Sequence, residues 1–140
     1  TRMSERFRLM ELRDFGDARG GMCVLEGGQT LPFEIRRIFY DFHTTGAEMR
    51  GNHANRRSQF AFVSVAGSCT VDADDGTEKQ SFLLDDPHKL LWLDRMTWKT
   101  MRDFSPDNVL LVLSDCHYDA GEYIRDYDEF LAICRKKETS

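Results

Sequence analysis

A single histidine lies among polar and basic residues directly before a predicted strand. The segment 50–55 reads Arg-Gly-Asn-His-Ala-Asn and leads into the largely apolar run 59–65. His53 therefore stands where a loop becomes a strand, and Arg56 and Arg57 follow it. Because an imidazole with an ordinary pKa of about 6.5 can exchange a proton at neutral pH, His53 is a candidate acid/base group. A lone histidine is more often structural than catalytic, so its role depends on these neighbours.

The surroundings of His53 in the sequence lack the donors of a metal site. A transition metal needs three or four nitrogen, oxygen or sulfur ligands at about 2.0–2.2 Å. Carboxamides stand at Asn55 and Gln59, where a second imidazole and a carboxylate would be needed, and the segment 92–101 contains no histidine. We therefore expect a pocket without metal or other cofactor, in which His53 does acid/base or binding work.

A second candidate for proton transfer is Tyr40, in the alternating segment 33–42. Charged and aromatic residues share both faces of this segment, as in a strand that lines a polar cavity. A phenol with a pKa of about 10 can give a proton to a developing alkoxide. A core tyrosine with a satisfied hydroxyl is an equally good interpretation. The other histidines, which we expect to be non-catalytic, are His43, His88 and His117.

Arginines are concentrated in the first half of this acidic chain. The group considered for a binding role is Arg19, Arg36, Arg37, Arg50, Arg56 and Arg57. The net charge of −5 argues against nucleic acid as the main partner. A local group of guanidinium side chains, however, matches the geometry of phosphate oxygens. The arginines therefore indicate either a pocket for an anionic ligand or scattered surface charges paired with acids.

The composition is that of one globular domain over residues 1–140, with 41% hydrophobic residues. No apolar run is long enough to span a membrane, and the N-terminus does not resemble a signal peptide. The cysteines Cys23, Cys69, Cys116 and Cys134 are widely spaced and form no CxxC pair. We therefore expect free thiols in a reduced, cytoplasmic protein that does not associate with membranes.

Short apolar runs separated by turn signals predict an all-β domain. The expected strands cover residues 20–25, 33–42, 60–66, 69–74, 80–84, 89–93, 97–104 and 108–114. Asp75-Gly76 is typical of a hairpin turn. Since no helix pattern interrupts the strands, they favour an antiparallel barrel or sandwich over about 17–118. Beyond it, a helical apolar spacing predicts a core-facing helix over about 119–136, in which Asp119 and Glu122 have the spacing of a capping box.

With these residues in view, the chain resembles the dTDP-4-oxo-6-deoxy-D-glucose 3,4-ketoisomerases, which are WxcM-like sugar-isomerase cupins. The resemblance extends from about residue 17 to 130. The motifs that carry it are Asp17-Ala18-Arg19-Gly20, Leu31-Pro32-Phe33-Glu34-Ile35-Arg36-Arg37-Ile38-Phe39-Tyr40, Arg50-Gly51-Asn52-His53-Ala54, Val65-Ala66-Gly67-Ser68-Cys69, Asp74-Asp75-Gly76, Met101-Arg102-Asp103-Phe104-Ser105 and Tyr123-Ile124-Arg125-Asp126-Tyr127.

The resemblance implies a homodimeric cupin-type jelly-roll barrel that binds a dTDP-linked 4-keto-6-deoxy sugar. The implied chemistry moves the ketone from C4 to C3 through an enediol, without a metal or redox cofactor. His53 matches the family's catalytic base, and Tyr40 matches a cavity residue near the sugar. Arg19, Arg37 and Arg50 match positions around the substrate. The product would pass to a PLP-dependent aminotransferase that makes an amino sugar for a surface glycan such as the O-antigen of lipopolysaccharide.

Two positions depart from the family pattern. This chain has His-Ala-Asn where well-known members have His-Ala-His, and Asn55 can hydrogen-bond a sugar hydroxyl or His53 but cannot carry a proton. Lys99 stands where the family often has histidine or arginine, and it could donate a proton or hold an anion. These departures keep two alternatives open, an isomerase or epimerase for another nucleotide sugar and a non-catalytic nucleotide-sugar binding module.

Overall fold

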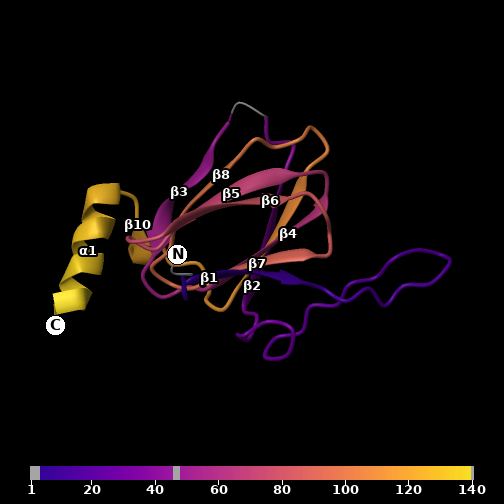
Figure 1. Cartoon of the computed structure of the whole chain (residues 1–140), viewed down its shortest axis with the longest axis horizontal. Helices are drawn as coiled ribbons and strands as arrows, with labels where there is room; N and C mark the ends of the chain where they lie inside the picture. Colours follow the sequence, from indigo (N-terminus) through magenta and orange to yellow (C-terminus); the bar gives the residue numbers. More distant parts are fainter. Residues whose placement is uncertain (1–3, 46–47, 140) are drawn as a thin grey trace.

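In the computed structural model, which describes residues 4–45 and 48–139, two antiparallel sheets face each other and a helix follows at the C-terminus (Figure 1). The strands are β1 (Phe7–Glu11), β2 (Arg37–Phe42), β3 (Arg50–Asn55), β4 (Phe60–Ala66), β5 (Cys69–Asp74), β6 (Lys79–Leu84), β7 (Lys89–Leu93), β8 (Trp98–Arg102), β9 (Val109–Ser114) and β10 (Tyr123–Ile124). A 3-10 turn, η1 (Ala120–Glu122), precedes β10, and the helix α1 is Tyr127–Thr139.

One sheet has the strand order β1-β7-β4-β9-β2 and the other has the order β10-β3-β8-β5-β6. Alternating side chains of each sheet point into the space between them, so that Phe60 and Phe62 of β4 meet Val71 of β5 in the main core. On the opposite face of β4, Ala61 and Val63 join a second apolar cluster. Both faces of β4 are therefore buried, which explains its unbroken apolar run. The predicted all-β domain with a C-terminal helix is confirmed.

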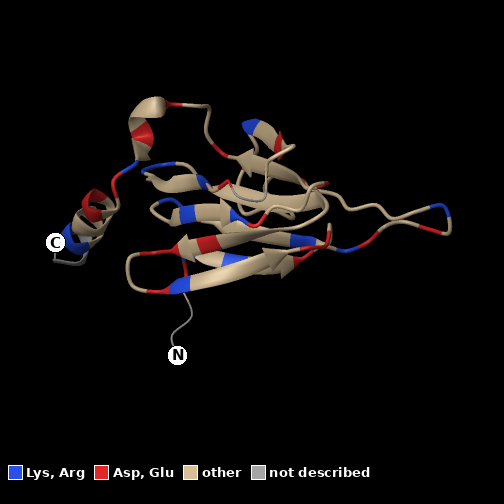
Figure 2. Ribbon diagram, turned by 90° about the horizontal axis from the view of Figure 1, so that it is seen from above, with Lys and Arg blue, Asp and Glu red and all other residues tan. Residues whose placement is uncertain are grey.

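The segment between β1 and β2 differs from the expectation. Residues 20–25 do not form a strand, and most of residues 12–36 run as a long extended arm that projects from one end of the barrel (Figures 1 and 2). Near its end, Leu31 and Phe33 of the arm return to cover the outer face of β4. The barrel instead gains the unexpected strand β1, which pairs with β7 before the expected start at residue 17.

The C-terminal helix begins at Tyr127, later than the expected Asp119. Asp119 Oδ1 accepts a hydrogen bond from Gly121 N at 2.9 Å, and so it caps the 3-10 turn rather than α1. Tyr123 then pairs with Asn55, which adds β10 to the edge of β3. The expected core-facing helix stripe is confirmed by Phe130, which is fully buried. Over the residues described here, no helix is long and apolar enough to cross a membrane.

Candidate active site

A β-bulge in β3 sets the direction of His53. Gly51 pairs with Thr100 and His53 pairs with Lys99, which leaves Asn52 as the extra residue. Asn52 has a φ of 57°, a left-handed conformation that asparagine tolerates, and its Oδ1 accepts a hydrogen bond from Thr100 Oγ1 at 3.1 Å. As a result, His53 and Lys99 lie directly opposite each other on adjacent strands, where side chains of one face meet.

The bulge depends on a glycine at position 51. Gly51 has a φ of 87°, and a Cβ atom there would lie 2.8 Å from the carbonyl oxygen of Lys99 and 3.2 Å from Met101 Sδ. Contacts below about 3 Å are not tolerated against backbone atoms, so any side chain would push β3 away from β8. Gly51 therefore permits the close approach that places His53 beside Lys99.

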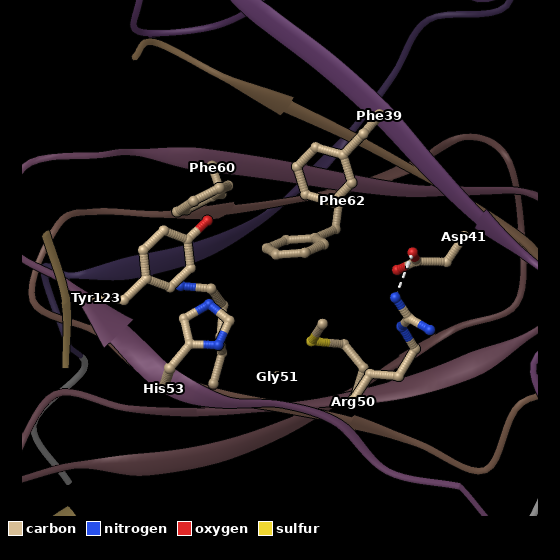
Figure 3. A pocket seen from close by; sticks show the side chains of 10 residues that line it. Phe39, Asp41, Arg50, Gly51, His53, Phe60, Phe62 and Tyr123 are labelled. Atoms are coloured by element: carbon tan, nitrogen blue, oxygen red, sulfur yellow. Dashed lines mark ion pairs between the residues drawn. The ribbon is translucent and has the colours of Figure 1, made fainter. Parts of the chain in front are cut away.

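His53 lines a cavity of about 140 Å³ between the two sheets (Figure 3). The lining residues are Phe39, Asp41, Arg50, Gly51, His53, Phe60, Phe62, Lys99, Met101 and Tyr123. His53 and Tyr123 stand at one end of this cavity, and the Asp41–Arg50 ion pair stands at the other, with phenylalanine rings between them. The site is thus an apolar chamber with a proton-transfer end and a charged end.

His53 is held in its neutral form. Burial lowers its pKa to about 4, and the positive charge of Lys99 acts in the same direction. Its Nδ1 is buried without a hydrogen-bond partner among the described residues. The ring packs against Tyr123 with 4.8 Å between the ring centroids. At neutral pH His53 is therefore an uncharged imidazole, which can accept a proton.

Lys99 is the second titratable group at this end of the cavity. Its Nζ donates to Asn55 Oδ1 at 3.0 Å and lies 4.3 Å from the centroid of the Phe60 ring. Burial lowers the pKa of Lys99 to about 7, while the negative charge of Glu122 opposes that shift. An ammonium group with this pKa can release a proton near neutral pH. The structure therefore brings together three residues singled out in the sequence, His53, Asn55 and Lys99.

Two arginines supply positive charge to the region. Arg50 forms an ion pair with Asp41 at 3.1 Å, and its side chain is 51% exposed while that of Asp41 is 11% exposed. Burial raises the pKa of Asp41, and the charge of Arg50 opposes the increase. Arg37, at the start of β2, has two guanidinium nitrogens, Nε and Nη2, that are buried without a partner among the described residues. A buried guanidinium with free donors is prepared to receive an anion or a carbonyl oxygen.

Two residues expected at the site lie outside the cavity. Tyr40 is 60% exposed on the outer face of β2, because alternation along the strand turns Phe39 and Asp41 inward instead. The expectation that Tyr40 lines the cavity is therefore wrong for this chain on its own. Arg19 lies on the projecting arm, where it pairs with Asp17, and its side chain is 91% exposed. No part of this chain's cavity is formed by Arg19.

The structure also adds two residues that sequence reasoning missed. Tyr123 lies within the range expected to be helical, but as part of β10 its ring packs on His53. Glu122 was assigned to a capping box, but it is 2% exposed behind the cavity and accepts hydrogen bonds from Arg57 N and Ser58 N. Local spacing fits a helix here equally well. A buried charge at position 122 could have been recognised only once its partners in residues 57–58 were known.

The cupin fold often carries a metal ion, and the donors around His53 do not fit one. Among the residues that the structure describes, no group of three or more histidine, cysteine, aspartate or glutamate side chains is placed to hold a metal ion. The Asn55 oxygen is already used by Lys99, whose cationic group adjoins His53. A cation at this position would meet an ammonium group and only one imidazole.

Comparison with known proteins places this geometry in a family. The model of the WxcM-like, C-terminal (FdtA) family matches residues 5–135. A curated relative from Aneurinibacillus thermoaerophilus, TDP-4-oxo-6-deoxy-alpha-D-glucose-3,4-oxoisomerase, is 38% identical over 123 residues, which cover 88% of each chain.

Solved structures agree with this assignment. WlaRA from Campylobacter jejuni, a TDP-fucose-3,4-ketoisomerase, superposes with a TM-score of 0.87 at 38% identity, covering 91% of this chain and 94% of that one. A mutant of the 3,4-ketoisomerase QdtA from Thermoanaerobacterium thermosaccharolyticum, in complex with TDP-4-keto-6-deoxyglucose, superposes with a TM-score of 0.91 at 28% identity, covering 96% and 97%. This chain therefore belongs to the WxcM-like cupin family of sugar-nucleotide 3,4-ketoisomerases.

Proposed function

We propose that this chain is an isomerase that moves the keto group of a dTDP-linked 4-keto-6-deoxy hexose from C4 to C3. The observation that carries the proposal is the neutral imidazole of His53 facing Lys99 in a partly open cavity between the sheets. Ketoisomerisation needs a base for a carbon acid and a cationic or acidic group for the oxygen, and these two residues supply both. The activities of relatives such as the Aneurinibacillus enzyme support the same reaction.

The reaction is a redistribution of protons within one sugar. A base removes the hydrogen from C3, the electron pair forms a C3–C4 double bond, and negative charge develops on the C4 oxygen. Protonation of that oxygen gives the enediol. Loss of the proton from the C3 hydroxyl and return of a proton to C4 then leave the ketone at C3. No atom is gained or lost, and no redox partner is needed.

His53 acts as the base in this scheme. Because burial holds its pKa near 4, the ring is uncharged over the neutral range and needs no prior deprotonation. Phe60 and Phe62 form apolar walls of the cavity, from which a bound sugar would displace water. Excluding water strengthens the electrostatic interactions that stabilise an enediolate.

Lys99 acts on the oxygen side of the reaction. Lys99 lies on β8, opposite His53 of β3. Its Nζ donates a hydrogen bond to Asn55 Oδ1 at 3.0 Å. An ammonium group here stabilises the negative charge of the enediolate and, with a pKa of about 7, can also transfer its proton. The hydrogen bond that Asn55 accepts orients this group.

The cavity is too small to hold the whole substrate. A volume of about 140 Å³ is smaller than the roughly 300–1,000 Å³ typical of sites that enclose a whole drug-sized ligand. The reacting hexose is the part that enters, and the dTDP group must extend beyond the cavity. Arg50 at the charged end and the unpartnered guanidinium of Arg37 are the proposed phosphate or carbonyl contacts. The neighbour QdtA binds TDP-4-keto-6-deoxyglucose, which supports this substrate class.

We also propose that the chain works as a homodimer. Ile38, Tyr40 and Phe42 form an apolar row, each more than half exposed, on the outer face of the edge strand β2. Such a row favours burial against a second copy. The projecting arm would then carry Arg19 toward the neighbouring copy, the arrangement in which Arg19 could contact substrate. Light scattering of the purified protein should give twice the chain mass.

The 3-keto product is suited to a PLP-dependent aminotransferase, because a sugar ketone is the substrate that such an enzyme aminates. We propose that this reaction follows, in the assembly of a surface glycan such as an O-antigen. A cytoplasmic location is also proposed. It is supported by Cys23, Cys69 and Cys116, which are free thiols in the structure, since free thiols are typical of reducing compartments.

The test of the proposed function is isomerisation in D2O. The protein is incubated with TDP-4-keto-6-deoxyglucose, and the sugar is analysed by NMR and mass spectrometry. We expect a 3-keto product with deuterium at C4. Exchange without a 3-keto product, or exchange confined to carbons other than C3 and C4, would replace this function with that of another isomerase or epimerase. Saturable binding without exchange or product, equal in wild type and His53→Ala, would identify a binding module instead.

A further inference from the structure

A buried carboxylate lies behind the proton-transfer end of the cavity, and the proposed mechanism does not use it. Glu122 is 2% exposed, at the end of the 3-10 turn before β10. Its Oε1 accepts hydrogen bonds from Arg57 N at 3.0 Å and Ser58 N at 2.9 Å, and its Oε2 accepts one from Ser58 Oγ. A buried charge is costly unless it is compensated, so these donors and any nearby cation decide its state.

Glu122 is held in its ionised form. Burial by itself would raise its pKa, but the hydrogen bonds from Ser58 and from the backbone amides of Arg57 and Ser58 outweigh burial and lower the pKa. At neutral pH the protein therefore keeps a negative charge beneath a cavity end whose other charges are positive.

The topology places this charge next to the partner of Lys99. Tyr123 pairs with Asn55 across β10 and β3, so Glu122 directly precedes the residue opposite Asn55. Asn55 Oδ1 in turn accepts the hydrogen bond of Lys99 Nζ at 3.0 Å. Glu122 on η1 is therefore adjacent in the backbone to the pair that includes the partner of Lys99, while Asn55 Nδ2 itself is buried without a hydrogen-bond partner among the described residues.

The charges that act on Lys99 come from each neighbouring element. From β2, Arg37 adds a positive charge that disfavours the ammonium form. From β3, His53 faces it as a neutral ring, and from β4 it meets the Phe60 ring. From η1, Glu122 supplies the negative charge that favours the ammonium form. Burial and Arg37 thus oppose a protonated Lys99, and Glu122 supports it.

We propose that Glu122 is a positioning residue of the ketoisomerase, whose carboxylate is the buried counter-ion that keeps the ammonium group of Lys99 protonated and ready to meet the developing enediolate. This inference rests on the proposed function. It assigns Glu122 a role in the reaction although its side chain does not line the cavity.

A structural role would be an alternative, because Glu122 also ties residues 57–58 to the turn before β10. The substitution Glu122→Gln separates the two roles. The amide oxygen of glutamine can still accept from Arg57 N and Ser58 N, and its NH2 group can donate to Ser58 Oγ. Only the negative charge is lost.

The first experiment is the pH dependence of kcat/KM, which reports ionisations of the free enzyme. Without the counter-charge, the pKa of Lys99 should fall further, so we expect the basic limb of the Glu122→Gln profile to move about one pH unit lower. Asp115→Asn is the matched control, since Asp115 also accepts a backbone hydrogen bond, from Gln59 N at 2.8 Å. Its basic limb should remain that of wild type. A Glu122→Gln basic limb that coincides with wild type would overturn the proposal.

The second experiment observes Lys99 without activity. The protein is labelled with 13C-lysine, the Lys99 signal is assigned from its loss in Lys99→Met, and the signal is titrated. We expect the Lys99 midpoint to fall in Glu122→Gln and to stay near that of wild type in Glu122→Asp, which keeps the charge. Equal Lys99 titration midpoints in wild type and Glu122→Gln would refute the proposed counter-ion role of Glu122. A fall of the same size in Glu122→Asp would refute it as well. This titration stands even if wild type proves to have no ketoisomerase activity, so the two failures are distinguishable.

Discussion

His53 and Lys99 are directly paired across β3 and β8, and the positive charge of Lys99 helps to lower the pKa of His53. The pair has pKa values of about 4 for the imidazole and about 7 for the ammonium group, each set first by burial. Between these values, a neutral base faces a charged acid. Two titratable groups whose environments give them well-separated pKa values are suited to act as base and acid in one reaction.

His53→Asn should abolish isomerisation while leaving substrate binding largely intact. Removing a general base typically reduces the rate by about 10²–10⁴-fold. The measurement is kcat by NMR, together with the Kd for TDP from calorimetry. His117→Asn, at an exposed position, is the control and should match wild type. A His53→Asn enzyme with more than a tenth of wild-type kcat would exclude His53 as the base.

The pH profile of wild-type kcat/KM should be bell-shaped. The base must be neutral, so activity rises as pH increases through about 4, the pKa of His53. The acid must be protonated, so activity falls as pH increases through about 7, the pKa of Lys99. In Lys99→Met the overall rate should drop and the fall near pH 7 should disappear. Persistence of that fall in Lys99→Met would assign it to another group.

Lys99 should also make folding stability depend on pH. Its pKa is about 7 in the folded chain and about 10.4 in an unfolded one, so between these values the unfolded chain binds more protons. The stability of wild type relative to Lys99→Met should therefore rise with pH, by about 2 kcal/mol between pH 7 and 9.

Urea unfolding of both proteins across this range measures the change. Lys79→Met, at an exposed lysine, is the control and should keep a constant offset from wild type between pH 7 and 9. If the difference between wild type and Lys99→Met does not vary with pH, Lys99 is not a buried ammonium group with a depressed pKa.

Substitution of Tyr40 should leave kcat nearly unchanged, whereas substitution of Tyr123 should lower it. Tyr40→Phe removes a hydroxyl that is outside the cavity, so kcat should stay within about twofold of wild type. Tyr123→Leu removes the ring that packs on His53 and should lower kcat by about tenfold or more through loss of orientation. Steady-state kinetics of both variants measure these changes in kcat. A loss of about 100-fold in Tyr40→Phe would show that its hydroxyl reaches a reacting sugar, necessarily in a second copy.

Gly51→Ala should damage both stability and activity. The residue adopts a φ of 87°, and the added Cβ would lie 2.8 Å from the carbonyl oxygen of Lys99. Left-handed strain and this contact together should lower the free energy of unfolding by about 1–3 kcal/mol. Because the strain is relieved by moving β3 away from β8, His53 would also lose its alignment with Lys99. Thermal melting and kcat should both fall, and an unchanged Tm would contradict this account of the bulge.

The sequence by itself predicted the strands of the barrel core closely. The runs at 60–66, 69–74 and 89–93 coincide with β4, β5 and β7. Apolar periodicity and Asp-Gly turns are local signals, and they are strong when a strand is buried. The residue types around His53 made it a candidate in the sequence, and the resemblance to the ketoisomerases singled out Lys99 and Asn55 as departures from the family pattern. Alternation along the segment also divided residues 37–42 correctly into two faces.

Which face of β2 is turned inward, and which residues meet across strands, could be decided only by the tertiary structure. Alternation has a period of two on either face, so Tyr40 and Phe39 were equivalent until the position of β2 at the sheet edge was known. The pairing of His53 with Lys99 depends on a bulge and on register between distant segments. Glu122 and Tyr123 fit a helix by local spacing, and the free energy of long-range contacts, with Ser58 and His53 respectively, placed them elsewhere. Local pattern specifies elements, whereas the site arises from contacts between residues far apart in the chain.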